Sequence, residues 1–307
     1  MLGTTSLQWQ SPDSDAAPSG WIEQHMPLKI IEVLSVPSGT VNEDCVGAEA
    51  ALAWVIDAAT DVIEEALVGT ASDAAWFAVA LNAALCRYSH NPPADLARLP
   101  ALLAPELADE FDRAARRKPK QRYEHPSAAA LVVREGDKGL DYVSVGDCTL
   151  LLETSSGFAR IGTEAADAGD ACISDAIRRY QEREAMPTAE SARSYIWPKI
   201  RARRAQMNEP EGYGVWSITP PSAHYVCAGT VQPVEGGTAL LATDGLFRLV
   251  DVFARYSEQA MFKLALSRGL GALVEELRRL EAADRDNIHY PRAKTCDDAT
   301  GLLLRLS

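Results

Sequence analysis

The sequence lacks the cysteine patterns that mark a disulfide framework or a zinc site. Its 307 residues include six cysteines, and these are widely spaced, with no CxxC pair and no Cys/His zinc spacing. No apolar run approaches the ~18 residues that a membrane-spanning helix needs, and no N-terminal stretch has the pattern of a secretory signal. We therefore expect a cytoplasmic protein with reduced cysteines and no membrane partner.

Basic residues are outnumbered by acidic ones, 30 Lys and Arg against 43 Asp and Glu. The formal net charge is −13 at pH 7, which disfavours nucleic acid as the main partner because phosphate backbones attract basic surfaces. An anionic substrate would need a strong local positive charge, such as a bound metal ion. The hydrophobic content of 47% is ordinary for a globular protein and sufficient for a core.

The chain divides into a short polar start and one long globular region. Residues 1–26 are rich in Ser, Asp, Gly, Pro and Gln without periodicity, which predicts a flexible leader. No break in composition follows, so we expect residues 27–307 to form a single domain. Its short strands and tight turns favour antiparallel sheet over βαβ repeats. Strands are expected at 28–33, 50–56, 127–133, 140–145, 149–153, 213–218, 223–228, 238–242 and 301–306, and helices at 72–90, 96–117, 257–268 and 270–283.

Residues 164–208 differ in character from the rest of the chain. They are rich in Ala, Arg and Glu and predict two helices separated near residue 186, with Thr188 capping the second. Arg201, Arg203 and Arg204 make that second helix basic.

Acidic residues recur at the ends or starts of the predicted strands. The apolar strand 238–242 leads to Asp244-Gly245, which fits an ordinary Asp-Gly turn as well as a functional corner. Further acidic corners are Glu43-Asp44, Asp57, Asp147 and Asp297-Asp298. Carboxylates gathered in a fold repel one another unless a cation lies between them. Oxygen ligands without His or Cys favour Mg²⁺ or Mn²⁺, although periodicity alone does not bring these acids together.

Five motifs containing these acids follow one another in a definite order. They are Asn42-Glu43-Asp44, Val55-Ile56-Asp57-Ala58, Val145-Gly146-Asp147, Ala242-Thr243-Asp244-Gly245-Leu246-Phe247 and Asp297-Asp298-Ala299-Thr300, within residues 28–306. This order resembles the metal-dependent protein phosphatases of type 2C. The resemblance implies an α+β fold, a four-layer α-β-β-α sandwich of two antiparallel sheets flanked by helices, with two Mg²⁺ or Mn²⁺ ions in a cleft at one end.

The resemblance also implies metal-binding roles for seven residues. These are, in chain order, Glu43 near one ion, Asp44 holding ligands or waters in place, Asp57 bridging both ions, Ala58 as a carbonyl ligand, Asp147 at a weak third ion, and Asp244 and Asp297 at the other ion. Asp57, Asp244 and Asp297 would then serve the reaction, hydrolysis of phosphoserine or phosphothreonine in a phosphorylated protein by a metal-bridged water, without a phosphoenzyme. The chain has no Cys-x5-Arg signature, which a cysteine phosphatase would need.

The chain departs from the family pattern at four places. Ala59 stands where the family has a His that could protonate the leaving group. No arginine occurs in residues 37–41 to bind phosphate. Arg248 replaces an Asp that would help to hold the third ion, and is itself a candidate for binding phosphate. The helical segment 164–208 replaces a small flap, and we expect it to shape substrate choice.

Two functions from different classes therefore stay open. The first is an active metal-dependent serine/threonine phosphatase, favoured by the retention of Asp57, Asp244 and Asp297. The second is a catalytically weakened pseudophosphatase that acts as a binding or regulatory module, favoured by the missing His and Arg. A small-molecule phosphoester hydrolase is a weaker third hypothesis.

Overall fold

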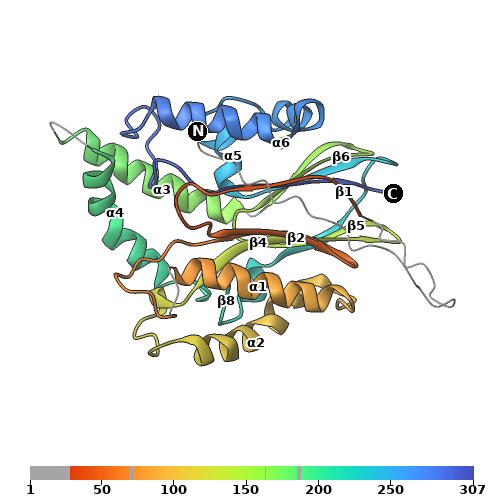
Figure 1. The fold of residues 1–307 in the computed structure, drawn as a ribbon, viewed down its shortest axis with the longest axis horizontal. Helices are drawn as coiled ribbons and strands as arrows, with labels where there is room; N and C mark the ends of the chain where they lie inside the picture. Colours follow the sequence, from red (N-terminus) through yellow and green to blue (C-terminus); the bar gives the residue numbers. More distant parts are fainter. Residues whose placement is uncertain (1–27, 69–71, 163, 185–187) are drawn as a thin grey trace.

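The computed structural model describes residues 28–68, 72–162, 164–184 and 188–307. Their strands form two antiparallel sheets stacked face to face, and helices cover the outer face of each sheet (Figure 1). This arrangement confirms the implied α+β fold, the four-layer α-β-β-α sandwich. The expected leader, residues 1–26, lies outside the described residues, and the single-domain boundary at residue 27 stays a prediction.

The two sheets contain all the named strands. The first sheet has the order β1-β11-β10-β6-β7 and the second the order β2-β3-β4-β5-β9, with the short β8 paired to β4. The first consists of β1 (Lys29–Val36), β11 (Ala299–Arg305), β10 (Thr238–Ala242), β6 (Thr149–Thr154) and β7 (Gly157–Ile161). The second consists of β2 (Asp44–Glu49), β3 (Leu52–Ala58), β4 (Ser127–Gly136), β5 (Gly139–Val145), β8 (Trp216–Ser217) and β9 (Cys227–Val231).

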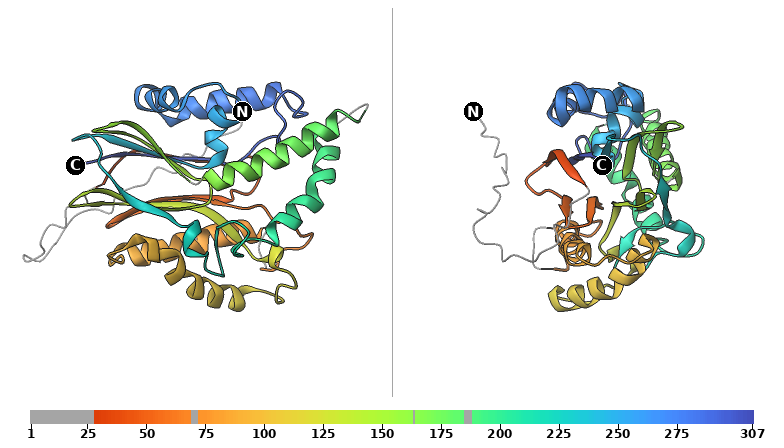
Figure 2. Two further views of the ribbon diagram at one scale, coloured as in Figure 1. Left: turned by 180° about the vertical axis from the view of Figure 1, so that it is seen from behind. Right: turned by 90° about the vertical axis from the view of Figure 1, so that its right-hand side faces the viewer.

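Helices cover both sheets and one end of the sandwich (Figures 1 and 2). The second sheet is covered by α1 (Asp73–Ser89) and α2 (Leu99–Ala114), and the first by α5 (Asp244–Asp251) and α6 (Glu258–Ala283). The pair α3 (Glu164–Gln181) and α4 (Ala189–Arg204) lies across one end. Short 3-10 helices occur at Leu96–Arg98, Arg122–Glu124 and Ala223–Tyr225. No helix in the described segments is long and apolar enough to cross a membrane.

Strand β3 shows how the layers are held together. Trp54 and Ile56 are buried against α1 and α2, whereas Ala53 and Val55 are buried between the two sheets. This follows from the alternation of side chains along a strand, and each large apolar side chain buried in this way contributes ~1.5–3 kcal/mol. Asp57 continues the series of Ala53 and Val55, so the alternation aims its carboxyl group between the sheets, at the end of the strand.

The predicted turn at Asp244-Gly245 is wrong, since this pair is the first turn of α5. The apolar residues that follow are buried against the first sheet at helical spacing, and this packing selects a helix. Gly245 is required for close packing, because a Cβ atom there would lie 1.8 Å from the carbonyl oxygen of Asp298.

Other elements differ from the prediction mainly in their bounds. The strand expected at 213–218 is reduced to β8, and that expected at 223–228 begins instead at Cys227, after a 3-10 turn. Strands β2 and β7 were not predicted, because their sequences carry little apolar alternation and depend on pairing with β3 and β6. Thr188 caps α4 through a reciprocal pair of bonds with Ser191, as predicted, and Gly269, at φ 81°, breaks α6 where two helices were expected.

Candidate active site

A cleft of about 670 Å³ opens at the end of the sandwich that α3 and α4 cover. Asp57 and Ala58 end β3, Asp147 follows β5, Asp244 begins α5, and Asp297 precedes β11. All five line this cleft. The fold thus brings together acids from four segments that are far apart in the sequence.

Asp57 is surrounded by other carboxyl groups. It is partly accessible from the cleft, but burial raises its pKa well above the usual range, and Asp244, Asp44 and Asp147 raise it further. Among the neighbouring charges, Asp244 has the largest effect on the pKa of Asp57. A cation between such groups relieves their repulsion, and oxygen donors alone suit Mg²⁺ or Mn²⁺. Asp57 and Asp244 therefore fit a divalent cation.

Asp44 lies directly opposite Asp57 in the pairing of β2 with β3. It is buried, and the Thr243 hydroxyl donates a hydrogen bond of 2.9 Å to its Oδ2 atom. Burial raises the pKa of Asp44 to about 8, although bonds from Thr300 and Thr243 act in the opposite direction. Asp44 is therefore beside Asp57 on the adjacent strand, and it is not part of the described cleft lining.

Glu43 is held by hydroxyl groups. Thr60 and Ser72 each donate a hydrogen bond to its carboxylate, the second at 2.6 Å. Its backbone N–H donates to Asp298 Oδ2 at 2.6 Å, and Ser38 N–H donates to the other oxygen of Asp298 at 2.6 Å. Asp298 therefore ties the N-terminal acidic motif to the C-terminal one, and the Glu43 carboxylate does not line the described cleft wall.

Asp297 lines the cleft but has cationic partners at both oxygens. Arg248 Nη2 lies 2.6 Å from Oδ2, and Lys294 Nζ lies 2.7 Å from Oδ1. Burial alone would raise the pKa of Asp297, but Arg248 and Lys294 hold it below the usual value. The charge of Asp297 is therefore already balanced within the chain.

These contacts leave the acids of the site with different numbers of free oxygens. Within the described segments, no three Asp, Glu, His or Cys side chains come close enough together to hold a metal ion by themselves. Glu43 is engaged by hydroxyls and Asp297 by two cations. Asp57 and Asp244 remain as the pair that fits a cation, with water completing the coordination as it commonly does for Mg²⁺.

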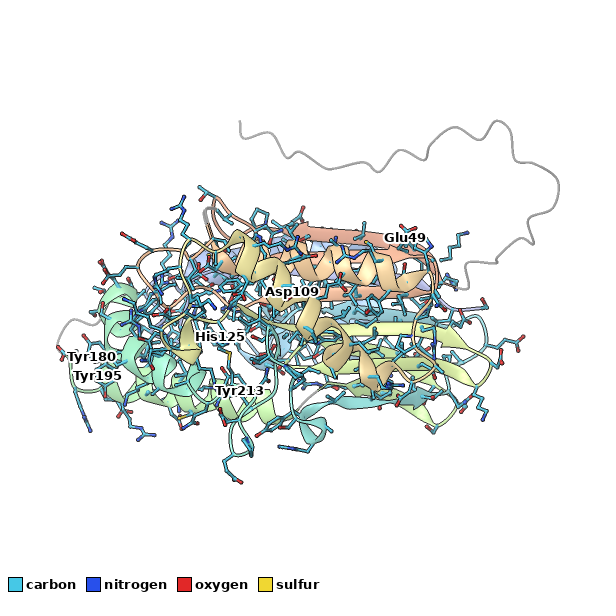
Figure 3. All side chains as sticks on the ribbon, turned by 90° about the horizontal axis from the view of Figure 1, so that it is seen from below. Glu49, Asp109, His125, Tyr180, Tyr195 and Tyr213 are labelled. Carbon is cyan, nitrogen blue, oxygen red and sulfur yellow. The ribbon has the colours of Figure 1, made fainter. Side chains whose placement is uncertain are left out.

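One face of α4 forms a basic and apolar wall of the cleft. Its lining residues are Arg193, Trp197, Ile200, Arg203 and Arg204, at the three- and four-residue spacing of a single helix face. The Arg193 guanidinium lies 4.9 Å from the Trp197 ring, and that of Arg203 lies 4.5 Å from the Tyr213 ring. At the outer end of the helical pair, Tyr180 and Tyr195 stack with ring centroids 4.8 Å apart (Figure 3).

Several cleft residues were not among the predicted site residues. Lys294 is the most important, and its only signal in the sequence is a cation three positions before Asp297. Arg292 is buried and pairs with Asp284 at 2.7 Å, which fixes the loop that carries Lys294 and Asp297. Neither role follows from spacing alone.

Comparisons with solved structures place the fold among bacterial phosphatases. The serine/threonine phosphatase PstP/Ppp of Mycobacterium tuberculosis is similar with a TM-score of 0.53 and 16% identity, over 91% of this chain and 99% of that chain. The catalytic domain of PstP, in complex with two manganese ions, gives 0.50 and 16%, over 91% and 98%. A bacterial serine phosphatase gives 0.50 and 13%, over 92% and 98%. No family model and no curated protein matches the sequence.

At these identities the similarity concerns the fold. The chain has the type 2C serine/threonine phosphatase fold that its motif order implied.

Proposed function

We propose that this protein is a divalent-cation-dependent phosphatase that removes phosphate from phosphoserine or phosphothreonine in proteins. The proposal depends on one observation: Asp57, Asp147 and Asp244 line the same cleft. There, burial and the neighbouring carboxylates raise the pKa of Asp57. The fold supports it, since the similar PstP catalytic domain was solved with two manganese ions. Groups with strongly shifted pKa values in a cleft are typical of functional sites.

Asp57 and Asp244 would hold the cation, with Ala58 beside them. A bound Mg²⁺ or Mn²⁺ would supply charge stabilisation for the phosphate and lower the pKa of a coordinated water. Asp44 lies opposite Asp57 on the neighbouring strand, and Thr243 orients Asp44 through its hydroxyl. Asp298 fixes the loop that carries Glu43 and Asp44.

The rest of the cleft favours a phosphorylated peptide segment as the substrate. Arg193 and Arg203 offer positive charge to an anionic peptide, and Trp197 and Ile200 offer apolar surface to a neighbouring side chain. Residues of both α3 and α4 line one side of the cleft. These features extend the expectation that the segment 164–208 shapes substrate choice.

The replacement of the family's His by Ala59 affects protonation of the leaving group. Ala59 supplies no acid, and the hydroxyl of the adjacent Thr60 already donates to Glu43. Water would therefore have to protonate the leaving oxygen. General-acid catalysis typically contributes 10²–10⁴-fold, so we expect slow turnover.

The second candidate function is a pseudophosphatase that binds phosphoproteins without hydrolysing them. The specific observation in its favour is the double ion pair of Asp297 with Arg248 and Lys294, which occupies a carboxylate that the resemblance assigns to a metal ion. The two candidates differ in a single measurable property, cation-dependent turnover.

The test is hydrolysis of an aryl phosphate with and without Mn²⁺, using the full chain and the variant Asp244→Asn. Asp109→Asn is the matched control, because Asp109 is exposed on α2 (Figure 3) and is not part of the cleft lining. Turnover that requires Mn²⁺, persists in Asp109→Asn and is lost in Asp244→Asn supports the phosphatase. Folded protein that binds a phosphothreonine peptide but shows no turnover with Mn²⁺ or Mg²⁺ supports the pseudophosphatase.

A further inference from the structure

Two cations of the chain occupy the acidic site itself. Lys294 Nζ lies 2.7 Å from Asp297 Oδ1 and Arg248 Nη2 lies 2.6 Å from Oδ2, so both oxygens of this carboxylate have a charged donor. The Asp297 side chain is only 13% exposed. A cation from solution would therefore have to compete with two internal donors for the same two oxygens.

Lys294 also interacts with other acids of the site. Burial alone would lower the pKa of Lys294, but Asp297, Asp57 and Glu43 together raise it well above the usual range. The resemblance assigns these same three acids to metal ions. The ammonium group thus lies among carboxylates that a metal would otherwise join.

Two further hydrogen bonds hold the Arg248 guanidinium in place. Its Nη1 atom donates to Glu281 Oε1 at 3.3 Å and to the Lys294 carbonyl at 3.4 Å. Glu281 is fully buried, and Arg278 holds its other oxygen at 2.7 Å. A buried charged network of this kind leaves an uncompensated charge when one member is removed. Moving the Arg248 guanidinium away from the site would therefore leave Glu281 with one buried ion pair fewer.

Asp57 and Asp244 differ from Asp297 in this respect. In the described segments neither carboxylate forms a salt bridge with Arg248 or Lys294, although Arg248 interacts electrostatically with Asp244 and Lys294 with Asp57. Asp297 therefore has cations in direct contact, whereas Asp57 and Asp244 keep carboxylate oxygens that an added cation could contact.

We infer that Arg248 and Lys294 act as built-in counter-cations at Asp297, and that they exclude a divalent ion which this carboxylate would otherwise bind. The cleft then takes one divalent cation fewer than its acids could hold, with Asp57 and Asp244 as the remaining position. This inference rests on the proposed cation-dependent function, and it implies fewer bound ions than the family resemblance does. It also assigns Lys294 a role that the sequence did not suggest.

The test is calorimetric titration of the full chain with Mn²⁺, which counts bound ions independently of turnover. The double variant Arg248→Gln/Lys294→Gln should bind one more Mn²⁺ per chain than the wild type. The matched control is Arg87→Gln/Arg279→Gln, which removes two cations from exposed ion pairs with Glu106 and Glu276. Its stoichiometry should equal that of the wild type. Equal stoichiometry in the double variant and the wild type would overturn the inference.

A second variant covers the case in which the double variant does not fold. Lys294→Gln alone removes a side chain that is 32% exposed and leaves the buried Arg248 network intact. This variant should also bind one more Mn²⁺ ion than the wild type, with lower affinity than in the double variant because Arg248 remains. An unchanged number of bound Mn²⁺ ions would count against the inference. Phosphate release is measured on the same samples. No turnover combined with a gained ion refutes only the proposed function, and Mn²⁺-dependent turnover without a gained ion refutes only the inference.

Discussion

Asp44 and Asp57 occupy directly opposed positions on β2 and β3, so two carboxyl groups meet across one antiparallel pair. Like charges opposed in this way destabilise a sheet, and burial raises the pKa of both groups. Such an arrangement is expected where stability is given up for binding, because a cation at Asp57 would remove the repulsion.

The first prediction concerns this pair. Asp44→Asn removes a carboxyl group whose pKa, raised to about 8 in the folded chain, makes it destabilising at pH 7, and it keeps an acceptor for the Thr243 hydroxyl. In metal-free buffer we expect the free energy of unfolding to rise by ~0.5–1 kcal/mol, the usual range for a cross-strand pair. Urea unfolding in the presence of a chelator measures it.

The control for this prediction is Asp73→Asn. The Asp73 carboxylate accepts hydrogen bonds of 2.7 and 2.8 Å from the backbone N–H groups of Leu67 and Val68. Loss of these charge-assisted bonds should lower the free energy of unfolding by ~1–3 kcal/mol. If both variants are destabilised equally, the acids of the cleft are ordinary structural acids and the account of Asp44 fails.

The second prediction concerns metal addition. Mn²⁺ at about 100 times its dissociation constant should stabilise the folded chain by ~2.7 kcal/mol, visible as a rise in the melting temperature. Asp57→Asn should abolish most of this rise, because it removes the carboxylate at the centre of the site. Asp109→Asn should retain it. A rise of the same size in Asp57→Asn would show that Mn²⁺ binds elsewhere.

Much of the fold could be predicted from the sequence, and the reasons are local. The apolar runs of β3, β4 and β10 and the cap at Thr188 are each specified by neighbouring residues. Strand β2, by contrast, is an acidic and glycine-containing segment that depends on its partner β3. The Asp244-Gly245 pair has the local chemistry of a turn, but the apolar residues after it select a helix through tertiary packing.

The site could be predicted only in part. Motif order indicated that Asp57, Asp147, Asp244 and Asp297 belong together, and the fold does bring them to one cleft. The partners of each acid could not be predicted, since they depend on side-chain placement over long sequence distances. Lys294 at Asp297 is the clearest case, because a single lysine in a loop carries no pattern.

The third prediction concerns the α4 wall. Arg203→Ala should raise the KM for a phosphopeptide with acidic residues about 3- to 10-fold, and leave the kinetics with an aryl phosphate unchanged. The expected loss corresponds to one partly exposed charged contact, ~0.7–1.4 kcal/mol. Steady-state kinetics with both substrates measure it. Arg179→Ala, an exposed α3 arginine outside the cleft lining, is the control, and equal effects of the two variants would contradict a role of the wall in substrate binding.

The fourth prediction concerns the close approach at Gly245. A Cβ atom at this position would lie 1.8 Å from the carbonyl oxygen of Asp298, so Gly245→Ala must displace the backbone that carries Asp297 and Asp298. We expect a loss of ~1–3 kcal/mol in unfolding free energy, as for overpacking, together with weaker Mn²⁺ binding.

A matched glycine in α6 provides the opposite expectation. A Cβ atom at Gly271 would meet nothing within 4 Å, and alanine has the higher helix propensity, so Gly271→Ala should stabilise the chain by ~0.5–1 kcal/mol. Thermal unfolding of both variants measures the contrast. Destabilisation of similar size in both would show that the Asp298 contact is not the cause.

The most direct measurement of the central claim is phosphate release from a phosphothreonine peptide by the full chain, after removal of metal and again after addition of Mn²⁺. The account predicts no release without metal, slow release with Mn²⁺, and loss of that release in Asp244→Asn but not in Asp109→Asn. Release that persists without metal, or that is unchanged in Asp244→Asn, would contradict the claim that Asp57 and Asp244 hold a catalytic cation.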